Sequence, residues 1–221
     1  STDLVHEIRN PLTSLKSASE ILNETVDQSQ RSKLIDILNH DVQRIERLIT
    51  DYSQMLKDEV ALSKEKMKRI NLKTIAQSVV DDFNNIYEAK RGIKIILNDL
   101  NNHDEYYING IENRIEQIIA NLLDNSISFS DDNKKILVEI YKGDKDKIIF
   151  KVIDEGKGFK ETDTKKIFNR FYSNRPDTFG EHSGLGLNIV KNLVELHSAT
   201  INASNNVTQE GANVEIVFPK V

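Results

Sequence analysis

The sequence contains no cysteine. This absence excludes disulfide bonds, thiolate zinc sites, iron–sulfur clusters and cysteine nucleophiles. Tryptophan is also absent and aromatic residues make up only 6% of the chain, so any hydrophobic core must be mainly aliphatic. No apolar run approaches the roughly 18 residues of a membrane span, and the first residues do not have the pattern of a signal peptide.

An excess of positive charge is missing as well. The 221 residues include 30 basic and 35 acidic side chains, which give a formal net charge of −5. Because nucleic-acid binding depends on clustered basic residues that neutralise phosphates, no nucleic-acid partner is expected. A content of 38% hydrophobic and 29% charged residues is typical of a folded chain. The length allows one large domain or two small ones.

Residues 1–63 are predicted to form a helical hairpin. Apolar residues recur every three to four positions over residues 4–25, and from Leu34 to Leu56 they repeat about every 3.5 residues. The polar residues 27–30 predict a short connecting loop. A single hairpin covers each helix poorly, so we expect two copies to form a dimeric four-helix bundle. Since the apolar pattern is already under way at the start, we expect a fragment of a longer protein.

The charged residues 64–70 are predicted to link this hairpin to a second domain at residues 71–221. Helices are expected there at residues 72–90, 111–129 and 185–197, and strands at 93–97, 136–141, 148–153, 200–203 and 214–218. This mixture predicts an α+β fold in which an α/β sandwich follows the hairpin.

His6 is the first candidate for chemistry. It lies two residues from both Leu4 and Ile8, so on a helix its imidazole projects away from the apolar seam and is available as a nucleophile. The adjacent Glu7 can accept or orient the second ring proton. The alternative is an ordinary surface histidine on an amphipathic helix, and residue types alone leave both interpretations open.

Two segments of the second domain could bind a phosphorylated ligand. Asn121 and Asn125 lie one helical turn apart, and their amide oxygens are adequate ligands for Mg²⁺. Asp154 ends an apolar strand and could accept a hydrogen bond from an exocyclic amine such as that of adenine. Gly156 and Gly158 after it would let the backbone approach a flat ligand. Each segment alone could equally be a solvated helix face or a turn.

Gly184, Leu185 and Gly186 open the predicted helix at residues 185–197. Backbone N–H groups and the helix macrodipole make such a helix start favourable for phosphate. A single Gly-x-Gly can also be a packing feature of a loop.

The order of these segments is more specific than any one of them. The asparagine pair, Asp-x-Gly-x-Gly, Phe168-Asn169-Arg170-Phe171 and the Gly-Leu-Gly-Leu that starts at Gly184 resemble the N, G1, F and G2 boxes of sensor histidine kinases. Upstream, the stretch from His6 to Leu12 resembles their phosphoacceptor H box, and the resemblance covers essentially the whole chain. The stretches at residues 10–15 and 124–130 are similar to ChvG-type sensor kinases.

The resemblance implies a dimerising phosphotransfer hairpin, followed by a Bergerat-type domain that binds ATP and Mg²⁺. His6 would be phosphorylated on Nε2 by ATP, with Glu7 as its acid–base partner, and would pass the phosphoryl group to an aspartate of a response regulator receiver domain. Asn10 would orient water for dephosphorylating that regulator. Contact with a membrane is expected only through upstream segments, which makes this chain the cytoplasmic portion of an inner-membrane bacterial sensor.

The resemblance also implies roles at the nucleotide. Asn125 would ligate Mg²⁺, Asn121 would lie near the attacking side of the phosphate and Asp154 would bind the adenine amine. It further implies that Gly156 and Gly158 shape the adenine pocket and that Phe168 and Phe171 anchor a lid. Gly184, Leu185 and Gly186 would lie at the phosphate end of this lid.

One departure from the family pattern keeps alternatives open. Ser128 stands where relatives often have a lysine that contacts phosphate. A degenerate kinase that serves only as a dimeric docking module is one alternative. A Bergerat-fold ATPase is another, although such enzymes usually have a glutamate where Asn121 stands. His197 is expected to lie at a helix C-terminus, where a cation is favourable.

Overall fold

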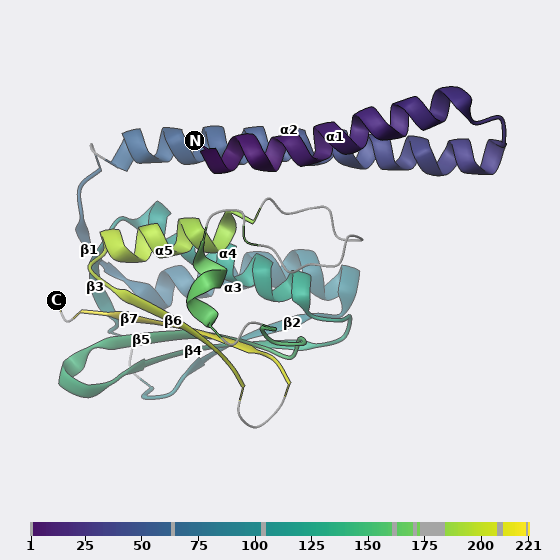
Figure 1. The fold of residues 1–221 in the computed structure, drawn as a ribbon. Helices are drawn as coiled ribbons and strands as arrows, with labels where there is room; N and C mark the ends of the chain where they lie inside the picture. Colours follow the sequence, from purple (N-terminus) through teal and green to yellow (C-terminus); the bar gives the residue numbers. More distant parts are fainter. Residues whose placement is uncertain are drawn as a thin grey trace. The chain divides into compact units, whose positions relative to one another are not determined.

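A computed structural model describes residues 2–62, 65–102, 105–160, 163–169, 172, 184–206, 210–219 and 221. The chain divides into two compact units, one of residues 1–63 with 169–185 and the other of residues 64–168 with 186–221. A helical hairpin is followed by a mixed α/β domain (Figure 1), which confirms the predicted α+β fold. No helix among the described residues has the length and apolarity needed to cross a membrane.

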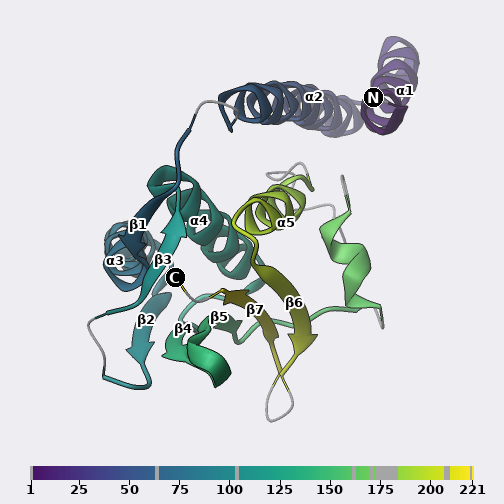
Figure 2. The same ribbon diagram turned by 90° about the vertical axis from the view of Figure 1, so that its left-hand side faces the viewer.

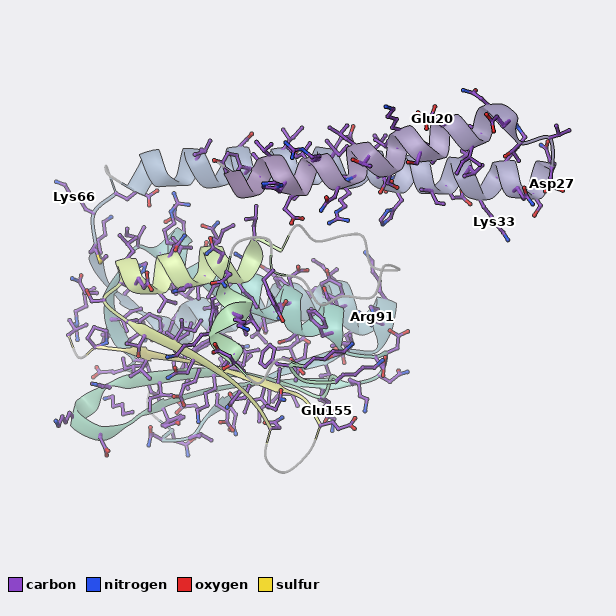
Figure 3. The ribbon with its side chains drawn as sticks, in the orientation of Figure 1. Glu20, Asp27, Lys33, Lys66, Arg91 and Glu155 are labelled. Carbon is purple, nitrogen blue, oxygen red and sulfur yellow. The ribbon has the colours of Figure 1, made fainter. Side chains whose placement is uncertain are left out.

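The hairpin consists of α1 (Thr2–Glu24) and α2 (Gln28–Leu62). Asp27, labelled at the turn in Figure 3, begins α2 because its Oδ1 accepts a hydrogen bond of 2.8 Å from the backbone N–H of Gln30. Arg31 closes the other side of the turn, since its Nη1 donates to the carbonyls of Leu22 and Thr25, each at 2.9 Å. The Asp27 bond therefore caps α2, and the two bonds from Arg31 tie its start to the end of α1 and the turn.

A single hairpin leaves much of its apolar surface uncovered. Ala18 and Leu48 are buried between the two helices. Other large apolar residues of the hairpin keep exposed fractions of 44–54%, namely Val5, Leu12, Ile21, Ile35, Ile37, Val42, Ile49 and Leu56. This exposure is what the sequence led us to expect of one half of a four-helix bundle.

The second unit is built on a five-stranded sheet with the order β2-β4-β5-β7-β6. Strand β2 runs parallel to β4, and the other neighbours are antiparallel. The strands are β2 (Lys94–Asp99), β4 (Lys135–Lys142), β5 (Ile148–Asp154), β6 (Thr200–Asn205) and β7 (Ala212–Phe218). One face of the sheet is covered by α3 (Leu72–Arg91), α4 (Glu112–Phe129) and α5 (Gly186–Leu196), as Figure 2 shows.

The core lies between this sheet and the helices. Along β5, buried residues alternate with half-buried ones, so that Ile148, Phe150 and Val152 face the helices. Helix α4 contributes Ile115 and Leu123, both fully buried. The core is aliphatic apart from a few aromatic rings, as the composition predicted.

Two strands were not expected from the sequence. β1 (Lys68–Asn71) pairs antiparallel with β3 (Tyr107–Gly110) in a separate two-stranded sheet. Most of β1 falls within residues 64–70, which the sequence suggested as a linker. With two adjacent charged residues and only four positions, β1 lacks an alternating pattern, and its partner lies about forty residues later in the chain. Short 3₁₀ turns, η1 (Asp144–Asp146) and η2 (Thr164–Phe168), complete the unit.

Candidate functional site

Asp154 is the most deeply buried carboxylate of the candidate site. It is the last residue of β5, the middle strand of the sheet, and is only 3% exposed. Its Oδ1 accepts hydrogen bonds from the backbone N–H groups of Gly156 at 2.9 Å and Ala212 at 3.0 Å. Burial raises the pKa of the Asp154 carboxyl, and these two bonds together with one from the Ser126 hydroxyl oppose the shift by stabilising the ionised form.

The backbone after Asp154 depends on glycine. A Cβ on Gly156 would lie 2.6 Å from the carbonyl oxygen of Phe129, the last residue of α4. Only glycine therefore fits at position 156. Gly158 has a φ of +69°, a left-handed conformation that favours glycine. The side chain of Asn205 fixes the next residue, since it accepts from the N–H of Phe159 at 2.6 Å and donates to its carbonyl at 2.9 Å. These contacts hold the loop at residues 155–159 in one conformation without any ligand.

Asn121 and Asn125 lie half-buried on α4, one turn apart as predicted. The hydroxyl of Ser128 donates to the carbonyl of Asp124 at 2.7 Å. The Ser128 hydroxyl therefore hydrogen-bonds the backbone of its own helix, and this residue brings no positive charge to this side of α4. Amide oxygens are the groups that α4 offers to a hydrated cation.

Gly184 and Gly186 precede and begin α5. Gly184 has a φ of +73°, which favours glycine. Among the described residues, apart from its chain neighbours and the backbone of its own helix, a Cβ on Gly186 would meet no atom within 4 Å, so contacts with these residues do not require glycine there. Space at the N-terminus of a helix, where backbone N–H groups and the macrodipole converge, suits an anion. Leu185, between the two glycines, is buried.

The ends of the predicted lid are only partly described. Phe168 closes η2, and its carbonyl accepts a hydrogen bond of 2.9 Å from Nδ2 of Asn188 on α5. The Oδ1 of Asn188 is buried and has no partner among the described residues. Phe171, which we expected to anchor the lid, lies outside the described residues. A polar residue on the buried side of a helix was the one indication of the Asn188 contact that could be found in the sequence.

On the hairpin, His6 is exposed, as its helical position predicted. The carboxylate of Glu7 lies 3.5 Å from Nη2 of Arg44 on α2, so its partner comes from the other helix. Asn10 is also exposed and lies one helical turn after His6, on the same side of α1. The helix continues through Pro11 without interruption. A nucleophile, a carboxylate and an amide therefore line one accessible stretch of α1.

His197 does not act as a cation at a helix end. It is 3% exposed, its Nδ1 lies 2.7 Å from the carbonyl of Leu193, and its Nε2 accepts from the N–H of Ile111 at 3.1 Å. A ring nitrogen that accepts a hydrogen bond carries no proton, so the imidazole is neutral. Burial lowers its pKa further below the ordinary value. The expectation that His197 follows a helix and caps its C-terminus is confirmed by the contact with the Leu193 carbonyl, but the cap is a neutral ring and not a cation.

The sequence did not identify three supporting residues, Ser126, Asn188 and Asn205. Each is polar and joins parts of the unit that are distant in sequence. Such contacts cannot be predicted from the neighbouring residues in the sequence. Only Ser126 had a nearby signal, because it directly follows Asn125. Ser126 donates to Asp154, Asn205 holds the loop at Phe159, and Asn188 holds the end of η2 against α5.

Comparison with known families accounts for both units. The family described as histidine kinase-, DNA gyrase B- and HSP90-like ATPase matches residues 110–221, and the His Kinase A phospho-acceptor domain matches residues 1–60. The chain therefore belongs to this ATPase family and, with its phospho-acceptor domain, to the sensor histidine kinases within it.

Among similar proteins are the sensor proteins ChvG of Rhizobium meliloti and Agrobacterium fabrum. Both are 34% identical in sequence over an alignment that covers 96% of this chain. The chain covers 37% and 36% of these two proteins, little more than a third of their length. The sensor protein kinase PmrB of Pseudomonas aeruginosa is 27% identical over 100% of this chain and 45% of its own. The similarity to ChvG agrees with the stretches noted in the sequence.

Solved structures share the fold. Histidine kinase ThkA in complex with the response regulator protein TrrA has a TM-score of 0.69 at 23% identity, over 100% of this chain and 60% of that one. Full-length ShkA in complex with AMPPNP has a TM-score of 0.62 at 21% identity, over 99% of this chain and 45% of that one. Acinetobacter baumannii AdeS also has a TM-score of 0.62, at 21% identity over 96% of both chains.

Proposed function

We propose that the chain is the catalytic core of a sensor histidine kinase, which transfers the γ-phosphoryl group of ATP to His6. The observation that carries the proposal is the buried Asp154 carboxylate, held by two backbone N–H groups beside glycines that leave no room for a side chain. Burying a carboxylate costs free energy unless its oxygens are paired or hydrogen-bonded. An adenine amine supplies a further donor and offsets part of that cost.

The adenine end of the site follows from this arrangement. Asp154 accepts a hydrogen bond from the exocyclic amine, while Gly156 and Gly158 bring the backbone close to the flat base. Because Oδ1 is already fixed by the N–H groups of Gly156 and Ala212, the carboxylate is oriented before the nucleotide arrives. Preorganisation of this kind lowers the entropic cost of binding.

The phosphate end lies at the start of α5. Gly184, Leu185 and Gly186 bound it, and the open space at Gly186 leaves room for phosphate oxygens next to the helix N-terminus.

The residues of α4 fit a magnesium ion. Asn125 would hold it through its amide oxygen, with Asn121 near the attacking side of the γ-phosphate. Neutral amide oxygens suit Mg²⁺, which keeps most of its waters and binds phosphate oxygens. When bound, the ion neutralises charge on the phosphates. No lysine is present at Ser128, so more of this neutralisation depends on the metal and on the α5 N-terminus.

Transfer to His6 is an in-line displacement. Nε2 of His6 uses its lone pair to form a bond to the γ-phosphorus, and the bond from that phosphorus to the bridging oxygen breaks, so ADP leaves. The Nδ1 proton passes toward or is stabilised by the carboxylate of Glu7, whose position Arg44 supports at 3.5 Å. Phosphohistidine is a reactive intermediate, so a second transfer to a carboxylate can follow.

The second acceptor is an aspartate on the receiver domain of a response regulator. The structure of ThkA with the response regulator protein TrrA supports a partner of this kind. Asn10, exposed one turn after His6, orients water for the reverse function, the dephosphorylation of that regulator. Two copies associate through the uncovered apolar side of the hairpin. The parent protein is an inner-membrane sensor anchored by upstream segments, with this part in the cytoplasm.

A labelling experiment tests the proposal. The chain is incubated with Mg-ATP labelled on the γ-phosphate, and the stability of the protein-bound label in acid and base is measured. We expect acid-labile, base-stable label, which is characteristic of a phosphoramidate, and none in His6→Gln. His40→Gln, which alters an exposed histidine on α2, is the matched control and should label normally.

Three results would contradict the proposal. Label on His6→Gln equal to that of the unaltered chain would exclude His6. Steady ATP hydrolysis without a phosphoprotein would indicate an ATPase of the same fold. Failure to bind ATP would indicate a docking module.

A further inference from the structure

Glu65 forms a two-pronged ion pair with Arg114 of α4. Nε of Arg114 donates to its Oε2 at 3.0 Å, and Nη2 of Arg114 donates to its Oε1 at 3.2 Å. Asn113 adds a longer hydrogen bond of 3.4 Å to Oε1. Two parallel N–H···O bonds between a guanidinium and a carboxylate define both distance and orientation, unlike a single ion pair.

The arginine in this pair is buried in α4. Its side chain is 9% exposed, against 26% for that of Glu65. Nη1 of Arg114 also donates to Oε1 of Gln117 at 3.1 Å. A positive charge in the first turn of a helix opposes the macrodipole, and the Glu65 carboxylate restores a negative charge at that end. Arg114 therefore has a partner within α4, Gln117, and a charged partner outside the helix, Glu65.

The pair lies in line with the residues proposed to act at the phosphates. At 100° per residue, Arg114, Gln117, Asn121 and Asn125 fall within about 80° of one another around α4, on a single stripe. From Arg114 to Asn121 the rise along the axis is about 10 Å. Glu65 thus contacts the first turn of α4 on the same side of the helix that carries both asparagines.

Glu65 also follows closely on the phosphoacceptor hairpin. Helix α2 ends at Leu62, three residues before Glu65. Three residues of extended chain span no more than about 11 Å. The pair with Arg114 therefore limits how far the first turn of α4 can move from the end of α2, whatever arrangement the two units adopt.

We propose that Glu65 is a positioning residue for phosphoryl transfer, which couples the end of the phosphoacceptor hairpin to the helix that bears Asn121 and Asn125. The proposal rests on the proposed kinase function. By holding α4 through Arg114, Glu65 restricts the orientations in which the γ-phosphate is presented to His6. Its hydrogen bonds are to Arg114 and Asn113 and not to the residues proposed to hold the nucleotide, so its effect falls on the transfer rate and not on ATP affinity.

Three variants test the proposal in the whole chain. Glu65→Asp keeps the charge and shortens the reach, Glu65→Gln removes the charge, and Arg114→Lys replaces the fork with a single ammonium. Glu116→Gln, an exposed glutamate on the same helix, is the matched control. ATP affinity is measured by titration, KM and the rate at saturating ATP by autophosphorylation, and folding by thermal unfolding.

We expect Glu65→Asp and Glu65→Gln to lower the saturating rate at least about tenfold, with ATP affinity and KM within about twofold of the unaltered chain, because only alignment is lost. Combining Glu65→Gln with Arg114→Lys should lower the rate no further than the more severe single change, since both remove one interaction. The control should be unchanged.

Several outcomes would overturn the proposal. A saturating rate within twofold of the unaltered chain, or a faster one, in Glu65→Asp shows that the pair does not align the transfer. Parallel losses of ATP affinity and rate show a purely structural role. Additive effects in the double variant show that the two residues do not act together. If the unaltered chain is not phosphorylated at all, the proposed kinase function fails before this one is reached.

Discussion

Nε2 of His197 accepts a hydrogen bond of 3.1 Å from the backbone N–H of Ile111, so a residue beyond the end of α5 satisfies a donor at the start of α4. Ile111 precedes α4 and has no side-chain cap of its own. The imidazole must stay neutral to accept this bond. Protonation would set a charged donor against an N–H group inside the core, so α4 and α5 share a pH-sensitive contact.

The first prediction concerns acid stability. Burial lowers the pKa of His197 below its ordinary value of 6.5. Above that value the ring is neutral in both states and its contribution to stability is complete. As pH falls below it, the unfolded state binds a proton that the folded state resists, so stability is lost at up to about 1.4 kcal/mol per pH unit until the lowered folded pKa is reached.

Thermal unfolding across this range checks the prediction. The midpoint should fall more steeply for the unaltered chain than for His197→Gln between about pH 7 and about pH 5.5. Equal slopes in the two proteins would show that His197 does not titrate with unfolding.

The second prediction separates function from stability at Asp154. Asp154→Asn keeps an oxygen for the N–H groups of Gly156 and Ala212 but removes the buried charge. ATP binding should weaken by about 1.5–3 kcal/mol, or roughly 10- to 100-fold, because a hydrogen bond to a charged group is lost. Thermal stability at neutral pH should be equal or higher, since burial raises the pKa of this carboxyl and so disfavours its ionised form.

The pH dependence of the unaltered chain has a sign opposite to that of His197. As pH falls through the raised pKa of Asp154, the folded state binds a proton before the unfolded state does, and this site gains stability. Glu155→Gln, at the next position, is the control and should retain ATP affinity. A large loss of folding stability in Asp154→Asn with unchanged ATP affinity would contradict the assignment.

The third prediction compares two glycines. In the described part of the chain, a methyl group on Gly186 meets no atom within 4 Å beyond its chain neighbours and its own helix, whereas one on Gly211 would collide with the backbone carbonyl of Asp154. Gly186→Ala should therefore fold with equal or slightly greater stability, by up to about 1 kcal/mol from the gain in helix propensity. Its ATP affinity should still fall at least about tenfold because the methyl occupies the space proposed for phosphate.

Gly211→Ala should instead be destabilised by at least about 2 kcal/mol, since its φ of +138° and the collision both oppose a side chain. Chemical unfolding and ATP titration of the two variants measure both effects. Normal ATP affinity in Gly186→Ala would remove the phosphate site from the start of α5.

The fourth prediction concerns association through the hairpin. The chain should sediment as a dimer at micromolar concentration, because one hairpin leaves large apolar side chains about half exposed. Ile49→Glu places a charge among them and should shift the chain toward monomer. Val26→Glu adds the same charge at the turn, where the side chain is 94% exposed, and should remain a dimer. A monomeric unaltered chain would contradict the bundle.

The sequence predicted the elements whose signals are local. Helix α3 is an example, since Asn71 caps its start by accepting from Lys73 N–H at 3.1 Å and Gly92 ends it in a left-handed conformation. Strand β1 was missed because its pairing with β3 is set by contacts distant in sequence and not by its own four residues. Where signals are local and periodic, element type follows from the residues themselves.

The candidate site divides in the same way. The order of the motifs placed Asp154 at a strand end and the two asparagines on one helix, and both arrangements are present. The supporting bonds could not be predicted, because Ala212 reaches Asp154 across 58 residues and Arg114 reaches Glu65 across 49. Hydrogen-bond partners at such separations depend on the complete fold.

The location of the phosphoryl group tests the central claim most directly. After incubation with Mg-ATP, the chain is digested at neutral or alkaline pH and the modified residue is identified by mass spectrometry. We expect one phosphoryl group on His6, formed at least about tenfold more slowly in Asp154→Asn at an ATP concentration well below the Kd of the unaltered chain. A phosphoryl group on another residue, or an equal rate of modification of His6 in Asp154→Asn, would contradict the assignment.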